Sequence, residues 1–253
     1  KYKFIMATSK NTTQIIKDIV DQATKKKIAH LHTEGSSITG NIIQINGSRH
    51  VNFSSCSYLG LEHDERLKQG AIQAIQNFGT QFSASRAYVS LGLYEELESL
   101  LYKVFGNNKV VVTATTTLGH VAAIPVLVED GDAVILDHQV HHSVQTAAGL
   151  LKAKKVHMEM IRHNNMEMLE EKIKVLIQKH NKVWYMADGV YSMFGDVCPT
   201  DHIQQLLDKY EQFHFYVDDA HGMCCFGEHG SGFILSKMKL RKRMVLATSL
   251  NKA

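Results

Sequence analysis

The chain has 253 residues, of which 44% are hydrophobic and 21% charged, so it can bury a large core as one domain or as a domain with an extension. Its net charge of +3 is too small to indicate a nucleic-acid-binding protein, and no apolar run approaches the roughly 18 residues of a membrane span. Because the lysine-rich start lacks a compact apolar signal stretch, we expect a soluble cytoplasmic protein. Reduced thiols are expected at the four cysteines, which form no CxxC pair: Cys56, Cys198, Cys224 and Cys225.

The first third of the chain contains helix and hairpin signals. A polar helix is predicted around Thr12–His32, and alternating apolar and polar residues in Ile42–Phe53 predict a β-hairpin around Asn46-Gly47. Two further helices follow, with apolar faces made of Leu67, Ala71, Ile75 and Phe78 in the first and Leu93, Leu97, Leu101 and Val104 in the second.

From residue 109 onward, short apolar runs rich in β-formers alternate with helix-length segments. The clearest helix among these segments is Asn165–His180, which has a polar start and one apolar face. This alternation predicts an α/β fold with a mostly parallel sheet covered by helices. The predicted strands are Lys109–Thr113, Ala133–Leu136, Val183–Met186, His214–Val217 and Met244–Ala247.

Polar clusters follow these predicted strands. In open α/β sheets the carboxyl ends of the strands form the edge where ligands bind, because loops and helix N-termini converge there. The sequence therefore predicts a ligand site at this edge. Its five clusters are Thr115–Thr117, Asp137–His142, Asp188–Ser192, Asp218–His221 and Ser249–Lys252.

Three of these clusters indicate particular chemistry, each with an alternative. Thr115–Thr117 precedes a helix-like segment and suits a phosphate at a helix N-terminus, or only caps the helix. The acid and histidine of Asp218–Gly222 could hold a heterocycle, or ligate a metal together with side chains of Asp137–His142. Lys252 stands where a long amine could reach the crevice and form a Schiff base, although most lysines face solvent.

Four segments together resemble successive motifs of the pyridoxal-phosphate (PLP)-dependent α-oxoamine synthases. They are Asn52–Leu61 (NFSSCSYLGL), Asp188–Asp196 (DGVYSMFGD), Val217–Gly222 (VDDAHG) and Ser249–Ala253 (SLNKA). Their order and spacing agree with the family, and the resemblance covers about residues 41–253. The combination is far more specific than any single motif.

The resemblance implies the fold type I architecture of PLP enzymes, which is like that of aspartate aminotransferase. Residues 1–60 would form an N-terminal helix and hairpin segment, and residues 61–253 the PLP-binding large domain. The family continues beyond the position of Lys252 through further strands and a C-terminal small domain, which this chain does not include. The family is usually a homodimer with shared sites, so we also expect a homodimer.

The resemblance also implies roles for individual residues. Lys252 would form the Schiff base with PLP and shuttle a proton at Cα, and Asp218 would pair with the pyridine nitrogen. His221 would hydrogen-bond the phenolic oxygen, and His141, within an Asp-x-x-x-His-x-Ser segment, would stack on the ring. The remaining cofactor contacts would be Thr116, Thr117 and Ser249 at the phosphate and Ser192 near the ring.

The implied reaction condenses an acyl-CoA with an α-amino acid, with decarboxylation, to an α-aminoketone. Two other functions stay open. One is an aminotransferase of the same fold, although the Asp-Asp-Ala-His-Gly loop favours the synthase. The other is a metal-dependent hydrolase that uses the histidine and aspartate clusters.

The chain departs from the family at several positions. Cys56 and Ser57 stand where most members have Asn and Asp, and that Asn is expected to help hold the substrate carboxylate. A thiol at this position removes the amide donors. Thr116-Thr117 replaces a common Gly-Phe pair in the phosphate loop. These departures favour the branch that makes quorum-sensing α-aminoketone signals from medium-chain acyl-CoA.

Overall fold

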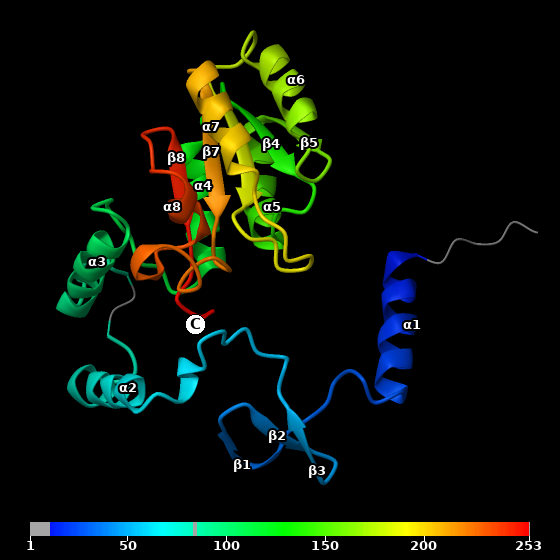
Figure 1. Cartoon of the computed structure of the whole chain (residues 1–253), viewed down its shortest axis with the longest axis vertical. Helices are drawn as coiled ribbons and strands as arrows, with labels where there is room; N and C mark the ends of the chain where they lie inside the picture. Colours follow the sequence, from blue (N-terminus) through cyan, green and yellow to red (C-terminus); the bar gives the residue numbers. More distant parts are fainter. Residues whose placement is uncertain (1–10, 83–84, 253) are drawn as a thin grey trace, which may run out of the picture. The chain divides into compact units, whose positions relative to one another are not determined.

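The computed structural model describes residues 11–82 and 85–252 and divides the chain into two compact units, Lys1–Ser55 and Cys56–Ala253 (Figure 1). The domain boundary predicted between residues 60 and 61 stays a prediction. Among the described helices, none is both long enough and apolar enough to cross a membrane.

The first unit begins with helix α1 (Thr12–Lys25). The side chain of Asn11 caps it by accepting a hydrogen bond from the Gln14 amide at 2.8 Å. The helix ends seven residues before the predicted limit at His32, because Lys27 and His30 adopt left-handed backbone conformations with φ of 56° and 54°.

Three antiparallel strands complete the first unit in the order β1 (Glu34–Thr39), β2 (Ile42–Ile45) and β3 (Ser48–Val51). The predicted hairpin is confirmed, since Ile45 pairs with Ser48 across Asn46-Gly47. Both turn residues have positive φ, 51° and 74°, as a two-residue turn between twisted strands requires. Strand β1 had no clear sequence signal and was not predicted.

The second unit contains a five-stranded sheet in which every neighbouring pair is parallel, in the order β5-β4-β6-β7-β8. The predicted α/β fold and four of the five predicted strands are confirmed. The strands are β4 (Ala133–Asp137), β5 (His157–Ile161), β6 (Val183–Asp188), β7 (Phe213–Asp218) and β8 (Met244–Ala247). Strand β5, which lies at the sheet edge, was missed because exposed and half-buried side chains interrupt its apolar pattern.

The strand predicted at Lys109–Thr113 is wrong. These residues form no regular element, and Val111 is 80% exposed. The amide of Val112 donates to the Glu98 carboxylate at 2.8 Å, and its carbonyl accepts from the Arg86 guanidinium at 2.9 Å. Side chains therefore occupy backbone groups that a neighbouring strand would otherwise bond.

Helices cover both faces of the sheet (Figure 1). Alternating side chains of its strands pack against these helices in two core clusters. Val134, Leu136 and Tyr216 share one core cluster with α4 (Thr116–Leu127) and α5 (His142–Gly149). Ile135 and Phe215 share the other cluster with α6, α7 and α8. Those three helices are α6 (Met166–Leu176), α7 (Thr200–Lys209) and α8 (Phe233–Lys237), and the short 3-10 helices are η1 (Leu61–His63), η2 (Leu150–Lys154) and η3 (Glu228–Gly230).

The helix predicted at Asn165–His180 corresponds to α6. Asn165 is its cap and accepts from the Met168 amide at 2.8 Å, so the polar start was read correctly. The helix ends at Leu176, earlier than predicted.

Helices α2 (Glu65–Phe78) and α3 (Gly92–Val104) confirm the two predicted helices before the sheet. Within the described chain, however, neither contains a buried residue. Apolar side chains on their predicted faces are exposed, including Leu67, Ile75 and Leu93.

Candidate active site at the carboxyl edge of the parallel sheet

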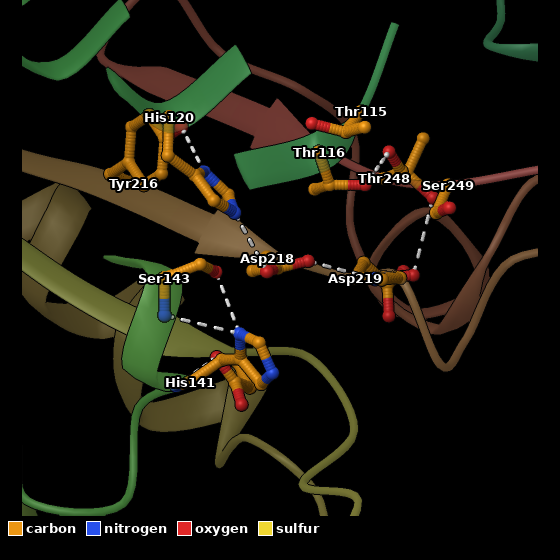
Figure 2. A network of polar contacts seen from close by, with 12 residues as sticks. Thr115, Thr116, His120, His141, Ser143, Tyr216, Asp218, Asp219, Thr248 and Ser249 are labelled. Atoms are coloured by element: carbon orange, nitrogen blue, oxygen red, sulfur yellow. Dashed lines mark hydrogen bonds and ion pairs between the residues drawn. The ribbon is translucent and has the colours of Figure 1, made fainter. Parts of the chain in front are cut away.

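The predicted polar clusters lie at one edge of the sheet. Strands β4, β6 and β7 each end in an aspartate, Asp137, Asp188 and Asp218, and the register places Asp188 opposite Asp218. Ala247 of β8 also pairs with Asp218. The hydroxyl of Thr116 reaches the carbonyl of Thr248 at 3.4 Å, so the start of α4 and the segment after β8 adjoin at this edge (Figure 2).

Asp218 is held inside this edge by two donors. Its side chain is only 6% exposed, and Oδ1 accepts from the Ala220 amide at 3.1 Å. Oδ2 lies 2.9 Å from Nε2 of His120, a fully buried residue of α4 (Figure 2). On the other side of the imidazole, Nδ1 lies 2.7 Å from the Tyr216 hydroxyl. The result is a continuous buried chain of three polar side chains.

His120 and Tyr216 were not among the site residues predicted from the sequence. Tyr216 stands two residues before Asp218 on the same strand, so their side chains face the same side of the sheet. His120 lies in the first turns of an otherwise apolar helix. A tyrosine and an aspartate at this spacing, together with one histidine in an apolar helix, were the available signals.

Asp219 has a different environment from its neighbour Asp218. It is 1% exposed, and its Oδ2 accepts from the Ile234 amide at 2.9 Å. A Cβ atom added at Gly189 or Gly222 would overlap its carboxylate, so this acid packs directly against glycine backbone. Burial raises the pKa of Asp219 to about 7. Asp219 therefore stabilises the loop by contacting its backbone, while Asp218 bonds the side chain of His120.

His141 caps helix α5, and its ring is fixed by Ser143. Its Nδ1 lies 2.6 Å from the Ser143 hydroxyl, and its backbone amide donates to Asp188 Oδ1 at 3.0 Å. Burial raises the pKa of Asp188 to about 8, and the nearby charges of Asp218 and Asp137 add to this shift, although the His141 amide opposes it.

His221 links three parts of the chain that are far apart in sequence. Its Nδ1 lies 2.6 Å from the Tyr58 hydroxyl, and the Tyr58 amide donates to the Lys252 carbonyl at 2.9 Å. Burial lowers the pKa of His221, and the positive charge of Lys252 lowers it further, whereas Asp218 acts in the opposite direction. Through its two hydrogen bonds, Tyr58 therefore brings His221, three residues after Asp218, close to the backbone of Lys252.

The other predicted site residues, Thr117, Ser249 and Ser192, form no described hydrogen bond with Asp218, His141 or His221. Thr117 is exposed on the first turn of α4, while Thr115 caps that helix by accepting from the Leu118 amide at 3.1 Å, as the capping alternative predicted. The hydroxyl of Ser249 donates to the Asn251 side chain at 2.5 Å. Ser192 is exposed after β6, and among the described contacts no hydrogen bond joins it to the rest.

A second polar network fixes the loop that contains Ser192. His163 bridges Asp137 at 2.9 Å through Nδ1 and Asp196 at 2.6 Å through Nε2. Burial lowers the pKa of His163, but its hydrogen bonds to the two carboxylates outweigh burial and leave that pKa raised. In residues 11–82 and 85–252, no group of three or more His, Cys, Asp or Glu side chains could hold a metal ion.

The family model that matches the chain is that of the class I and II aminotransferases, over residues 48–253. A protein named 8-amino-7-oxononanoate synthase from Fervidobacterium nodosum is 37% identical over 77% of this chain and 49% of its own length. A protein named serine palmitoyltransferase from Bacteriovorax stolpii is 32% identical over 79% of this chain and 46% of its own length. The chain thus spans about half the length of these relatives.

Solved structures share the fold. The serine palmitoyltransferase of Sphingomonas wittichii superposes with a TM-score of 0.78 at 24% identity, over 88% of this chain and 55% of the other. The 8-amino-7-oxononanoate synthase of Francisella tularensis superposes with a TM-score of 0.60 at 18% identity, over 77% of this chain and 53% of the other. The predicted fold type I large domain is therefore confirmed. Together with the family match over residues 48–253, the relatives show that the chain belongs to the class I and II aminotransferase family, among its PLP-dependent α-oxoamine synthases.

Proposed function

We propose that the whole protein is a PLP-dependent acyltransferase that condenses an acyl-CoA with an α-amino acid, with loss of carbon dioxide, to an α-aminoketone. Relatives named as 8-amino-7-oxononanoate synthase and serine palmitoyltransferase support this class of reaction. The observation that carries the proposal is geometric. Tyr58 bonds His221 through its hydroxyl at 2.6 Å and the Lys252 carbonyl through its amide at 2.9 Å, beside the buried carboxylate of Asp218 at the carboxyl edge of the sheet.

The described residues fit PLP. The Asp218 carboxylate suits a protonated ring nitrogen, because its burial strengthens an ion pair with a cation. The first turn of the 12-residue helix α4 offers backbone amides and the Thr117 hydroxyl to a phosphate dianion, with Ser249 and Thr116 beside it. The Lys252 amine would hold the aldehyde carbon.

Each side chain would then have a separate task. Asp218 would keep a proton on the ring nitrogen, and His141, braced by Ser143, would stack on the ring face. When bound, PLP supplies an electron sink for negative charge at the amino acid Cα. Lys252 Nζ would take the Cα proton, since an amine can act as a general base once it is deprotonated.

Tyr58 and His221 would serve the phenolic oxygen of the cofactor. Partial burial raises the pKa of the Tyr58 hydroxyl, which therefore stays protonated and can donate to His221 Nδ1. Burial lowers the pKa of His221, which favours the neutral ring. With Tyr58 donating to Nδ1, the single proton of that neutral ring would lie on Nε2. Nε2 would then be the donor to the phenolic oxygen.

Three narrower expectations belong to this proposal. The departures at Cys56 and Thr116-Thr117 support a quorum-sensing signal as the product, whereas the relatives above have other names. The exposed apolar faces of α2 and α3 support a homodimer, because such faces are usually covered. A cytoplasmic location agrees with substrates such as acyl-CoA.

The test uses the full-length protein incubated with PLP. We expect a visible chromophore, and borohydride reduction should trap PLP covalently in the wild type and in Lys239→Ala, which removes an exposed lysine. Lys252→Ala should lose the adduct. An adduct that persists in Lys252→Ala would contradict the lysine assignment.

A panel of acyl-CoA thioesters and amino acids then identifies the reaction. Consumption of the thioester with release of carbon dioxide is expected. Transfer of the amino group to an oxo acid, without use of a thioester, would instead support the aminotransferase of the same fold. Stoichiometric zinc without a chromophore would support the metal-dependent hydrolase.

A further inference from the structure

Asp218 is one end of a buried chain that none of the roles above uses. The chain runs from the Tyr216 hydroxyl to His120 Nδ1 at 2.7 Å, and from His120 Nε2 to Asp218 Oδ2 at 2.9 Å (Figure 2). His120 is 0% exposed and Tyr216 is 1% exposed. Since strand β7 and helix α4 supply the three side chains, the tertiary fold alone brings them together.

The donors and acceptors of this chain admit one arrangement while Asp218 is ionised and His120 is neutral. A carboxylate only accepts, so His120 Nε2 must donate to Asp218. In a neutral imidazole the other nitrogen then accepts, so the Tyr216 hydroxyl must donate to Nδ1. Burial, followed by the charge of Asp218, raises the pKa of Tyr216, which keeps the phenol protonated and able to donate. The tyrosine therefore selects the histidine tautomer that Asp218 needs.

This arrangement determines the orientation of the Asp218 carboxylate. Its two oxygens each accept one N–H hydrogen bond, from His120 and from the Ala220 amide. A neutral histidine leaves the full negative charge of Asp218 available to a second partner. The carboxylate also cannot rotate without breaking both bonds.

We propose that His120 and Tyr216 are positioning residues that hold Asp218 as an oriented carboxylate, and that they act through it on the protonation of the cofactor ring nitrogen. This inference rests on the proposed function, because it assumes that Asp218 faces the ring of PLP. It adds two residues that the motifs of the sequence did not identify.

The experiment compares variants of the full-length protein by titration with PLP. Tyr216→Phe keeps the ring but removes the donor to His120, and we expect PLP affinity to fall by about 3- to 10-fold, the usual effect of one hydrogen bond. His120→Leu removes the donor to a charged group, and a loss of about 10- to 100-fold is expected. His120→Gln can still donate an amide proton to Asp218 and should retain affinity within about threefold of the wild type.

A matched control separates this effect from a general loss of packing. Tyr185→Phe removes another buried hydroxyl, from the adjacent strand β6, which bonds Asp137 instead at 3.2 Å. Its thermal stability should fall about as much as that of Tyr216→Phe, while its PLP affinity should stay within about twofold of the wild type. In the two Asp218-directed variants, Tyr216→Phe and His120→Leu, the visible absorbance band of bound PLP and its pH dependence should also shift.

The outcomes distinguish this inference from the function on which it rests. If the wild type binds PLP, and Tyr216→Phe and His120→Leu bind it with the same affinity and the same band, the positioning roles are wrong and the proposed function stands. If the wild-type full-length protein does not bind PLP, both are wrong. Should His120→Leu not fold, Tyr216→Phe decides the matter alone, since it removes a single oxygen atom.

Discussion

The parallel sheet and the two helices before it carry similar apolar patterns but use them differently. In the sheet, strands β4 and β6 are buried along their whole length, and α6 buries Leu169 and Ile173 completely. In α2, an equally regular apolar face leaves Ile75 54% exposed. An amphipathic pattern thus determines that a helix forms, but burial depends on whether the fold supplies a surface against it.

The same difference separates the polar residues. At the carboxyl edge of the sheet, Asp218 and His141 have the buried partners His120 and Ser143, which fix their geometry. Polar groups around α2 and α3 bond on the surface, as in the exposed ion pair between Arg66 and Asp64. Exposed ion pairs of this kind contribute little to the stability of the fold. We therefore expect charge-changing substitutions to have their larger effects at the sheet edge.

The sharpest test of this contrast is Asp218→Asn, which removes the charge from the sheet edge but keeps its shape. We expect kcat of the full-length enzyme to fall on the order of 10²- to 10³-fold, the usual effect of removing one preorganised electrostatic group. Asp64→Asn, at the surface cap of α2, is the control and should leave kcat unchanged. Equal rates in the wild type and Asp218→Asn would remove Asp218 from the site.

A pair of isoleucine variants tests burial directly. Ile173→Ala, in α6, should lower the free energy of unfolding by about 2–5 kcal/mol, because the residue is fully buried. Ile75→Ala, in α2, should change it by about 0.5 kcal/mol or less if the face is exposed in solution. Urea unfolding at several protein concentrations provides the measurement. A large, concentration-dependent loss in Ile75→Ala would mean that a second copy covers α2, as the expected homodimer predicts.

The buried acids predict a pH dependence of stability. Asp188 ionises near pH 3.8 in the unfolded chain but has a pKa of about 8 in the fold, so the folded state binds the extra proton between these values. Its contribution to stability is complete below about pH 4 and is lost as the pH rises through 8. Asp188→Asn keeps an acceptor for the His141 amide but cannot ionise. Its free energy of unfolding, relative to that of the wild type, should therefore be higher at pH 9 than at pH 5 by about 1–3 kcal/mol. Asp130→Asn, at an exposed position, should show no such trend in urea unfolding.

The smallest expected effect concerns Cys56, which is exposed in the segment that leads to Tyr58. Cys56→Asn restores an amide that can donate hydrogen bonds to a carboxylate. We expect KM for the amino acid to fall by about 3- to 10-fold, with little change in KM for the acyl-CoA. Steady-state kinetics on the full-length enzyme check this, and an unchanged amino acid KM would mean that residue 56 does not contact that substrate.

Local patterns in the sequence predicted much of the fold. The strands that became β4, β6, β7 and β8 were recognised as short apolar runs, and the Asn46-Gly47 turn and the Asn165 cap were read from residues with strong backbone preferences. Strand β5 and the wrong strand at Lys109–Thr113 show the limit of this approach. Both are segments whose pairing partners, rather than their own residues, decide the conformation.

The sequence by itself determined the order of strands and helices, the family motifs and the edge at which the polar clusters gather, because each depends on a few neighbouring residues. Only the tertiary structure decided that His120 bonds Asp218 across 98 residues, and that Tyr58 bonds His221 across 163 residues. Such pairs carry no local signal, since hydrogen bonds between distant side chains form only after the hydrophobic core has brought their elements together and excluded water from around them.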